Sequence, residues 1–165
     1  RVGAAAAALL VALAAAAGVQ NVPPLDVQEA GLRTSLAQTA AVIVRAGDVI
    51  EVDYPIRLAF VPDGNELLPA ARQMLDILAG SLRAHERTQV VVAVYTDAIG
   101  SSEFNQQQSL ARATVVVDCL RGDRIAAARL IARGVGEGEP LNAENTPAGR
   151  DLNRRLRLTI TPLSS

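Results

Sequence analysis

The sequence has no lysine and no tryptophan, and it has only one cysteine and one histidine. A lone cysteine, Cys119, allows neither an intrachain disulfide nor a cysteine metal cluster, and we expect it to be a small buried hydrophobe. His85 has no partner at metal-ligand spacing, so we interpret it as a solvated residue at a helix end. Because these two residues lie on separate segments without supporting groups, we expect no catalytic activity, no metal and no cofactor.

The chain also has almost no net charge, since it carries 16 basic and 17 acidic residues and its pI is about 5.9. Without a basic field there is nothing to attract nucleic acid or an anionic membrane surface, so nucleic acid is excluded as a partner. Half of the 165 residues are hydrophobic. This length and composition predict one ordinary domain with a real core, together with a short extra segment.

The extra segment is at the start of the chain, where residues 2–19 are uncharged and consist of Ala, Val, Leu and Gly. Their number is at the lower limit for crossing a bilayer, and Ala15 and Ala17 form an A-x-A pattern that is typical of signal-peptide cleavage. A cleaved signal peptide, a retained membrane anchor and an ordinary buried helix are the three interpretations. The weak hydrophobicity of alanine favours the first, and we assign residues 1–20 to a signal peptide or anchor that exports the rest.

The exported part alternates predicted strands and helices. The strands are apolar runs bounded by turn residues, at 41–44, 49–52, 56–60, 89–95, 130–135 and 155–160. The helices have apolar residues at helical spacing, loosely at 25–40, then from Glu66 onward and at 103–121. Gly47 and Asp48 mark a hairpin turn, residues 21–40 are a linker or helical segment, and residues 136–149 are a polar loop. The order predicts an α/β (α+β) sandwich with helices on one face of a sheet.

The second long helix carries Asn105, Ser109 and Arg112 at i, i+4 and i+7, which places them on one face. We expect this face to be separate from an apolar stripe that consists of Leu110, Ala113, Val117 and Leu120. The helix should begin after an N-cap at Ser101 or Ser102. Because Asp97 closes the valine-rich strand that leads into this helix, its carboxylate should lie near the helix's N-terminal half.

An acid and an arginine on either side of one cleft suit a zwitterion. Asp97 can pair with a ligand ammonium, while the planar guanidinium of Arg112 can take a carboxylate through two hydrogen bonds. The ligand would be a small amino-acid-like group. The alternative is structural: Asp97 makes an Asx turn, Arg112 covers the helix surface, and the two residues pair with each other.

Three ordered blocks of residues, within roughly residues 40 to 162, match one family signature. The first, TD…G…N…LS…RA, contains Asp97, Gly100, Asn105, Ser109, Ala111, Arg112 and Ala113. The second, G-x-G-E…P, contains Gly134, Gly136, Glu137 and Pro140. The third, N-T…GR…NRR, contains Asn145, Thr146, Gly149, Arg150, Asn153, Arg154 and Arg155. With these blocks the chain resembles the OmpA-like family, the C-terminal domain of outer-membrane protein A.

The resemblance implies that residues 41–163 form a domain that binds peptidoglycan without cleaving it. Asp97 and Arg112 would hold the free end of diaminopimelate. The same pocket would be lined by Thr96, Ala98, Asn105 and Ser109, with support from Asn153, Arg154 and Arg155. The implied fold is a mixed sheet of βαβαβ type with helices on one face, preceded by the apolar N-terminal helix. The implied location is the periplasm or cell envelope, with membrane attachment through an uncleaved N-terminal segment and other envelope proteins as partners.

The sequence departs from the family pattern at Val94 and Tyr95, where Gly-His is usual, and at Gln108, where leucine is usual. A valine side chain in place of glycine predicts a displaced strand end and weaker or altered binding. The alternative function is therefore a scaffold or interaction domain of an envelope complex that has lost wall binding. The glycine-rich run 134–138 superficially resembles a nucleotide-binding loop, but Glu139 takes the place of its last glycine, so we interpret the run as a turn.

Overall fold

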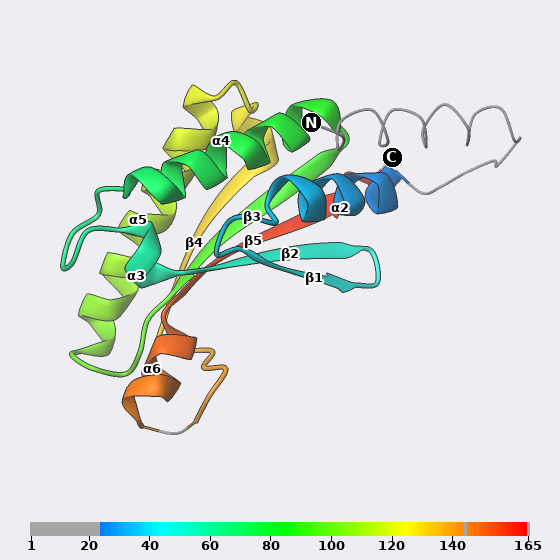
Figure 1. The fold of residues 1–165 in the computed structure, drawn as a ribbon. Coiled ribbons are helices and arrows are strands. Elements are labelled where there is room, and N and C mark those ends of the chain that lie inside the picture. Colours follow the sequence, from blue (N-terminus) through cyan, green and yellow to red (C-terminus); the bar gives the residue numbers. More distant parts are fainter. Residues whose placement is uncertain (1–23, 144, 165) are drawn as a thin grey trace, which may run out of the picture.

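The computed structural model describes residues 24–143 and 145–164, and Figure 1 shows their arrangement. The helices in chain order are α2 (Pro24–Ser35), α3 (Ile56–Ala59), α4 (Pro69–Ala84), α5 (Ser102–Gly122) and α6 (Pro147–Asn153). The strands are β1 (Val42–Ala46), β2 (Val49–Pro55), β3 (Thr88–Tyr95), β4 (Leu130–Gly136) and β5 (Arg155–Pro162). The predicted signal peptide or anchor lies outside the described residues. Within the described ranges, no helix is long and apolar enough to cross a membrane.

The five strands form one mixed sheet in the order β1-β2-β5-β3-β4. The β1–β2, β2–β5 and β5–β3 pairs are antiparallel, whereas β3 and β4 run parallel and are joined by the α5 crossover. The predicted hairpin is confirmed, and Gly47 in its turn has φ 58°, a left-handed conformation that glycine adopts without strain. The arrangement with helices on one face of the sheet, predicted from the alternating pattern, is also confirmed (Figure 1), as is the mixed sheet that the family resemblance implies.

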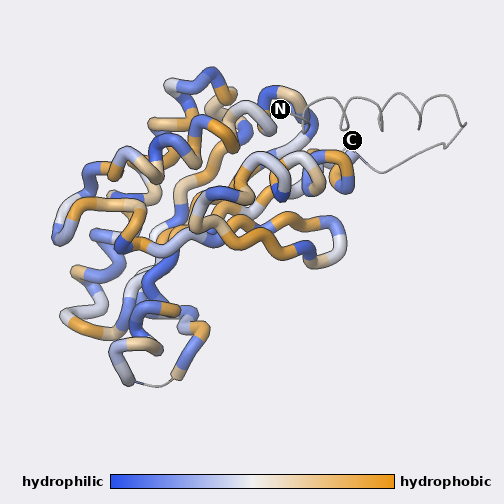
Figure 2. The backbone as a smooth tube through the Cα atoms, in the orientation of Figure 1, coloured by the Kyte–Doolittle hydropathy of each residue, from blue (hydrophilic) through white to orange (hydrophobic). Residues whose placement is uncertain are grey.

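The core lies between the helices and one face of the sheet (Figure 1). Every second residue of the central strands is fully buried on this face, as the period of two requires: Ile50, Val52, Val90, Val92, Leu158 and Ile160. Helix α4 covers them with its own apolar stripe of Met74, Leu75, Leu78 and Leu82. Figure 2 shows that the strands are hydrophobic near the centre of the sheet and hydrophilic where they approach α6.

Helix α2 packs onto the same core. Leu25 and Leu32, both buried, join the hydrophobic cluster beneath it. Arg45 of β1 adds salt bridges to Asp26 at 3.0 Å and to Glu29 at 3.2 Å. The domain boundary between residues 40 and 41 stays a prediction, but apolar residues on both sides of it share one core.

The strand predicted at residues 56–60 is wrong, because residues 56–59 form the short helix α3. Ile56 and Ala59 are buried and Arg57 is exposed, which is helical spacing and not alternation. Pro55 closes β2 and precedes the helix with φ −63°. A five-residue apolar run does not distinguish a strand from a buried helical turn by periodicity alone.

Two further boundaries differ from the prediction. Helix α4 begins at Pro69 and not near Glu66, because Leu67 pairs with Phe60 in an isolated β-bridge that keeps this part of the chain extended. The polar loop predicted at 136–149 ends early, because α6 begins at Pro147. Its start is fixed by Thr146, whose hydroxyl accepts a hydrogen bond from the Gly149 N–H at 3.1 Å.

The buried side of α5 is one continuous stripe and not two separate faces, which corrects the prediction. Its buried residues are Asn105, Ser109, Arg112, Ala113, Val116 and Leu120. Leu110, which was assigned to the apolar stripe, is 46% exposed. This residue approaches β4 through its backbone, opposite Gly134, so its side chain is left at the surface. The helix is thus polar where it faces the end of β3 and apolar where it faces the core.

The two residues that the composition singled out lie at the edge of the core. Cys119 is half-buried and packs against the hydrophobic cluster, and burial raises the pKa of its thiol. His85 is the C-cap residue of α4, and its N–H donates to the Ser81 carbonyl at 3.1 Å. Its placement at a helix end is confirmed.

Candidate functional site

A cleft of about 780 Å³ opens at the carboxyl end of β3. Its walls come from α3 and the turn that follows it, from the N-terminal half of α5, and from the end of α6. Among the predicted site residues, those that line the cleft are Thr96, Asp97, Asn105, Arg112 and Arg154. Those that do not line it are Ala98, Ser109, Asn153 and Arg155.

Asp97 is positioned by the turn that joins β3 to α5, and it is only 7% exposed. Its Oδ1 accepts a hydrogen bond from the Ile99 N–H at 3.0 Å, which is the Asx turn considered in the sequence. Its Oδ2 lies 3.4 Å from Nη1 of Arg154. The turn therefore fixes one carboxylate oxygen and leaves the other with capacity to accept a hydrogen bond inside the cleft.

Arg112 reaches the same cleft from the third turn of α5, and it is 8% exposed. Its Nε and Nη2 donate to the Gly64 carbonyl at 3.0 and 2.9 Å, and its guanidinium carbon lies 5.2 Å from the centre of the Phe60 ring. Burial lowers the pKa of Arg112 and Asp63 opposes this shift, but an arginine stays protonated in proteins.

The contacts of Arg112 leave the Nη1–Nη2 edge of its guanidinium available to bind a ligand. A guanidinium has five N–H groups, and the Gly64 carbonyl takes one from Nε and one from Nη2. One N–H on Nη2 and both on Nη1 form no further hydrogen bond within the described ranges. Nη1 and Nη2 therefore form a planar edge that can donate two parallel hydrogen bonds to a carboxylate.

Asp97 and Arg112 form no ion pair with each other within the described part of the chain. Each is nearly buried and held by its own neighbours, Asp97 by Ile99 and Arg112 by Gly64 and Phe60. The cleft therefore presents an anionic and a cationic group that are both fixed in advance. The pairing proposed in the structural alternative is absent, although its Asx turn is present.

Asn105 holds the wall between these two charges. It is 3% exposed, and its Nδ2 donates to the Ile99 carbonyl at 3.0 Å and to Glu137 Oε2 at 2.9 Å. A longer contact of 3.3 Å reaches the carbonyl of Asp97. Ser102 donates to the other oxygen of Glu137 at 2.6 Å. Asn105 thus ties the turn that carries Asp97 to the loop after β4, and it uses its donors to do so.

The hydrogen bonds from Ser102 and Asn105 lower the pKa of Glu137. We expect the stability from this carboxylate to be fully present above its unfolded pKa of about 4.3 and to be lost as pH falls through the lower folded value. Replacing Glu137 with glutamine should therefore reduce the thermal stability near pH 7 and much less near pH 3. Thermal melts across this range check the result, with the exposed Glu66→Gln as control. An equal difference at every pH would contradict it.

Ser109 and Asn153, which do not line the cleft, hold backbone segments next to it in place. Ser109, fully buried, donates to the Gln106 carbonyl at 2.9 Å and accepts from the Gly136 N–H at 3.0 Å, so it holds the end of β4 against α5. Asn153 exchanges two hydrogen bonds with the backbone of Asn142, at 2.9 and 2.8 Å, and so joins the end of α6 to the preceding loop.

Arg155, the first residue of β5, packs on Tyr95, the last residue of β3. Its guanidinium carbon lies 3.6 Å from the centre of the Tyr95 ring, and it donates to the Glu139 carbonyl at 3.3 Å. Burial lowers the pKa of Arg155.

Val94 is buried in the core, and the pairing of β3 with β4 shifts register between Val94 and Tyr95. Val94 and Tyr95, which depart from the family pattern, therefore lie where the pairing of β3 with β4 becomes irregular.

Sequence reasoning missed the groups that hold Arg112. Phe60 was assigned only to the predicted strand at residues 56–60, and the Gly64 carbonyl belongs to a turn whose backbone atoms leave no residue-type signal. Two exposed apolar residues at the cleft were also missed, Ile99 at 61% and Phe104 at 57% exposure. Their exposure was the missing information, because an apolar residue near a helix start normally predicts burial.

Residues 59–154 match the OmpA family. The probable lipoprotein YiaD of Escherichia coli (strain K12) is 33% identical over 139 residues, which are 84% of this chain and 64% of that protein. The peptidoglycan-binding protein ArfA of Mycobacterium tuberculosis (strain ATCC 25618 / H37Rv) is 34% identical over 62% of this chain and 32% of ArfA. The chain belongs to the OmpA family, and it spans less than two thirds of the length of these relatives.

Solved structures have the same fold. The cell wall anchor of the T6SS from Pseudomonas aeruginosa has a TM-score of 0.70 and 26% identity, and the match covers 79% of this chain and 96% of that one. A MotB-like protein from Desulfovibrio vulgaris has a TM-score of 0.75 and 24% identity, with 84% and 91% coverage. At that identity the second comparison supports the fold alone.

Proposed function

We propose that this domain binds peptidoglycan non-covalently, through the free amino-acid end of a diaminopimelate-type stem peptide, and so anchors the cell envelope to the wall. The observation that carries the proposal is the pair of nearly buried, mutually unpaired charges in one cleft. Asp97 Oδ2 accepts a hydrogen bond from the ligand ammonium. The Nη1–Nη2 edge of Arg112 receives the carboxylate on the same ligand carbon.

The proposed site is already ordered before the ligand arrives, which lowers the cost of binding. Asp97 is held by the Asx turn and Arg112 by Gly64 and Phe60, so neither side chain has to be immobilised by the ligand. Arg112 gains a partner of opposite sign inside the cleft, and the ligand ammonium joins or displaces Arg154 at Asp97 Oδ2. Thr96 and Asn105 line the wall between them, and the exposed Ile99 and Phe104 offer apolar surface to the remainder of the wall polymer.

Membership of the OmpA family and the roles of two relatives support the proposal. ArfA is a peptidoglycan-binding protein, and the Pseudomonas aeruginosa protein is a cell wall anchor. We further propose that the domain lies in the cell envelope, on the periplasmic side, and that it acts as a binding module. Attachment to a membrane through the N-terminal segment and assembly with other envelope proteins belong to the same proposal.

One contact favours the alternative of a scaffold domain that does not bind the wall. Arg154 lies 3.4 Å from Asp97 Oδ2 and competes with a ligand ammonium for this oxygen. The side chain of Arg154 is 42% exposed and it also pairs with Asp151, so water screens its contact with Asp97. A scaffold domain would keep this contact and show no saturable binding to the wall.

Co-sedimentation of the wild-type protein with two kinds of purified sacculi tests the proposal. Diaminopimelate offers an ammonium and a carboxylate at its free end, whereas lysine at the same stem position offers the ammonium alone. We expect strong retention on the diaminopimelate type and retention at least tenfold weaker on the lysine type, because only the first engages Arg112. Equal retention on both, or none on either, would contradict the proposed site.

A further inference from the structure

Arg154 brings a second guanidinium to the cleft, on the side of Asp97. Its Nη1 lies 3.4 Å from Asp97 Oδ2, and its Nη2 donates to Oδ1 of Asp151, which lines the same cleft. The contact with Asp97 is longer than a normal N–H···O hydrogen bond of about 2.7–3.2 Å, so it is an ion pair. A positive charge therefore stands beside the oxygen that is to receive the ligand ammonium.

The backbone of Arg154 is fixed at the rim of the cleft. Its N–H donates to the Arg150 carbonyl at the end of α6, at 3.0 Å, and its carbonyl accepts from the Ile56 N–H of α3, at 3.1 Å. The contact with Asp151 holds the guanidinium from the other side. The positive charge thus stays close to Asp97 when a ligand ammonium approaches Oδ2.

The 3.4 Å contact sets the size of the effect on a ligand. An ammonium nitrogen about 2.8 Å from Asp97 Oδ2 would lie at most about 6 Å from Arg154 Nη1. This separation is shorter than the Debye length of about 8 Å, so salt screens the repulsion only in part. At effective dielectric constants of about 80 to 40, the repulsion weakens the binding of a lone ammonium by roughly three- to tenfold.

A ligand with a carboxylate next to its ammonium is affected differently. The free end of diaminopimelate carries both groups on one carbon, so the net charge of this end is zero. Attraction between its carboxylate and Arg154 then offsets the repulsion between its ammonium and Arg154. Arg154 therefore acts against a lone ammonium and leaves a zwitterion nearly unaffected.

We propose that Arg154 is a specificity-determining residue of this cleft, which excludes ligands that offer an ammonium alone and admits those in which a carboxylate accompanies it. The inference rests on the proposed peptidoglycan function and adds a second source of selectivity. Arg112 favours the carboxylate by direct contact, whereas Arg154 disfavours ligands that lack it. The excluded ligands are lysine side chains, both in lysine-type stem peptides and in proteins.

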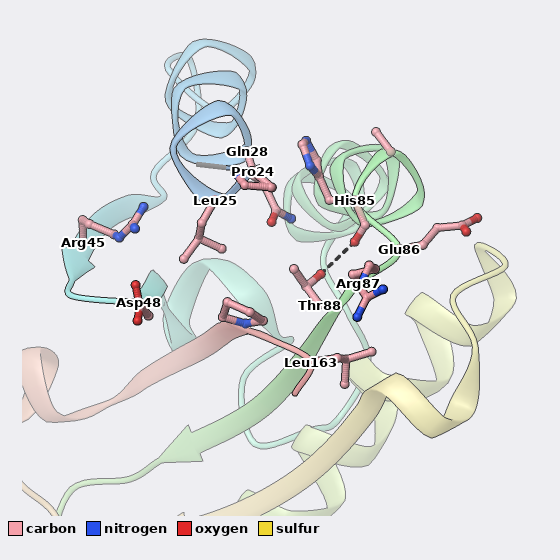
Figure 3. A pocket seen from close by; sticks show the side chains of 12 residues that line it. Pro24, Leu25, Gln28, Arg45, Asp48, His85, Glu86, Arg87, Thr88 and Leu163 are labelled. Atoms are coloured by element: carbon pink, nitrogen blue, oxygen red, sulfur yellow. Dashed lines mark hydrogen bonds between the residues drawn. The ribbon is translucent and has the colours of Figure 1, made fainter. Parts of the chain in front are cut away.

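Arg87 offers a matched control far from this cleft. It is exposed and lines a cavity of about 570 Å³ at the other end of β3, shown in Figure 3. The eight residues of β3, roughly 25 Å in length, separate Arg87 from Asp97. Because this length is about three Debye lengths, Arg87→Gln removes one positive charge from the chain without changing the field at Asp97.

NMR titrations of the isotope-labelled full chain test the proposal with two ligands, meso-diaminopimelate and Nα-acetyl-lysinamide, whose ammonium has no carboxylate beside it. In Arg154→Gln we expect Nα-acetyl-lysinamide to bind roughly fivefold more tightly than in the wild type, and the affinity for diaminopimelate to change by less than about twofold. Arg154→Lys, which restores the charge, should restore the discrimination. Arg87→Gln should bind both ligands as the wild type does.

The proposal is overturned if Arg154→Gln changes both affinities by the same factor, which would make Arg154 a simple competitor or a structural residue. It is also overturned if neither affinity changes, or if Arg154→Lys behaves as Arg154→Gln does. In each of these cases diaminopimelate still binds and the proposed function stands. If the wild type binds neither ligand, the proposed function itself fails and the specificity role falls with it.

Discussion

Replacing Asp97 with asparagine should weaken retention on diaminopimelate-type peptidoglycan by roughly 10- to 150-fold, which corresponds to about 1.5–3 kcal/mol for a hydrogen bond to a charged group. Asparagine keeps the shape of the side chain, and its Oδ1 can still accept from the Ile99 N–H, so the Asx turn remains. The variant therefore removes the charge without removing the turn. Sedimentation with sacculi measures the loss of retention.

The matched control for this variant is Asp151→Asn. Asp151 lines the same cleft and also pairs with Arg154, but its side chain is 51% exposed and water screens its charge. Its replacement should change retention by no more than about fivefold, since surface ion pairs contribute at most about 1 kcal/mol. If Asp97→Asn is retained as well as the wild type, Asp97 is not a ligand-binding residue.

Replacing Gly134 with alanine should destabilise the fold by about 3 kcal/mol or more and lower the Tm by roughly 10 °C. A Cβ at this position would lie 2.4 Å from the backbone nitrogen and 2.7 Å from the Cα of Leu110. These are backbone atoms within a helix, so α5 itself has to move away from β4. Because α5 carries Asn105 and Arg112, wall binding should weaken along with stability.

Gly31→Ala is the matched control for Gly134→Ala. Gly31 lies inside α2, and a Cβ there would meet nothing within 4 Å. Alanine at such a helical position should stabilise the protein by about 0.5–1 kcal/mol. Thermal melts of both variants provide the comparison. A Gly134→Ala protein as stable as the wild type would show that α5 and β4 do not pack as closely as described.

Elements with a strong local signal were predictable from the sequence. The valine run gave β3, Gly47 and Asp48 gave the hairpin turn, and the serine before the second long helix gave its N-cap at Ser101. Elements whose form depends on distant contacts were not predictable. Residues 56–59 are helical and pack against α4 and β2, and periodicity over a five-residue run could not reveal this.

In the candidate site, too, features set by local sequence were predictable and those set by distant contacts were not. Asp97 and Arg112 could be placed in one cleft because a short turn joins β3 to α5 and the spacing along α5 is regular. The groups that hold Arg112 could not, because the Gly64 carbonyl and the Phe60 ring come from a segment some fifty residues earlier in the chain. Ser109 shares the helix face as predicted, but the approach of Gly136 turns its hydroxyl toward β4.

A titration of the isotope-labelled protein with free meso-diaminopimelate, followed by NMR, tests the central claim most directly. We expect saturable shifts of the Arg112 side-chain Nε–H and of the Thr96 and Asn105 signals. Pimelate, which has the same carbon chain and carboxylates but no ammonium groups, should cause no saturable change because Asp97 then has no partner. The account is contradicted if diaminopimelate leaves these signals unmoved, or if pimelate binds equally well.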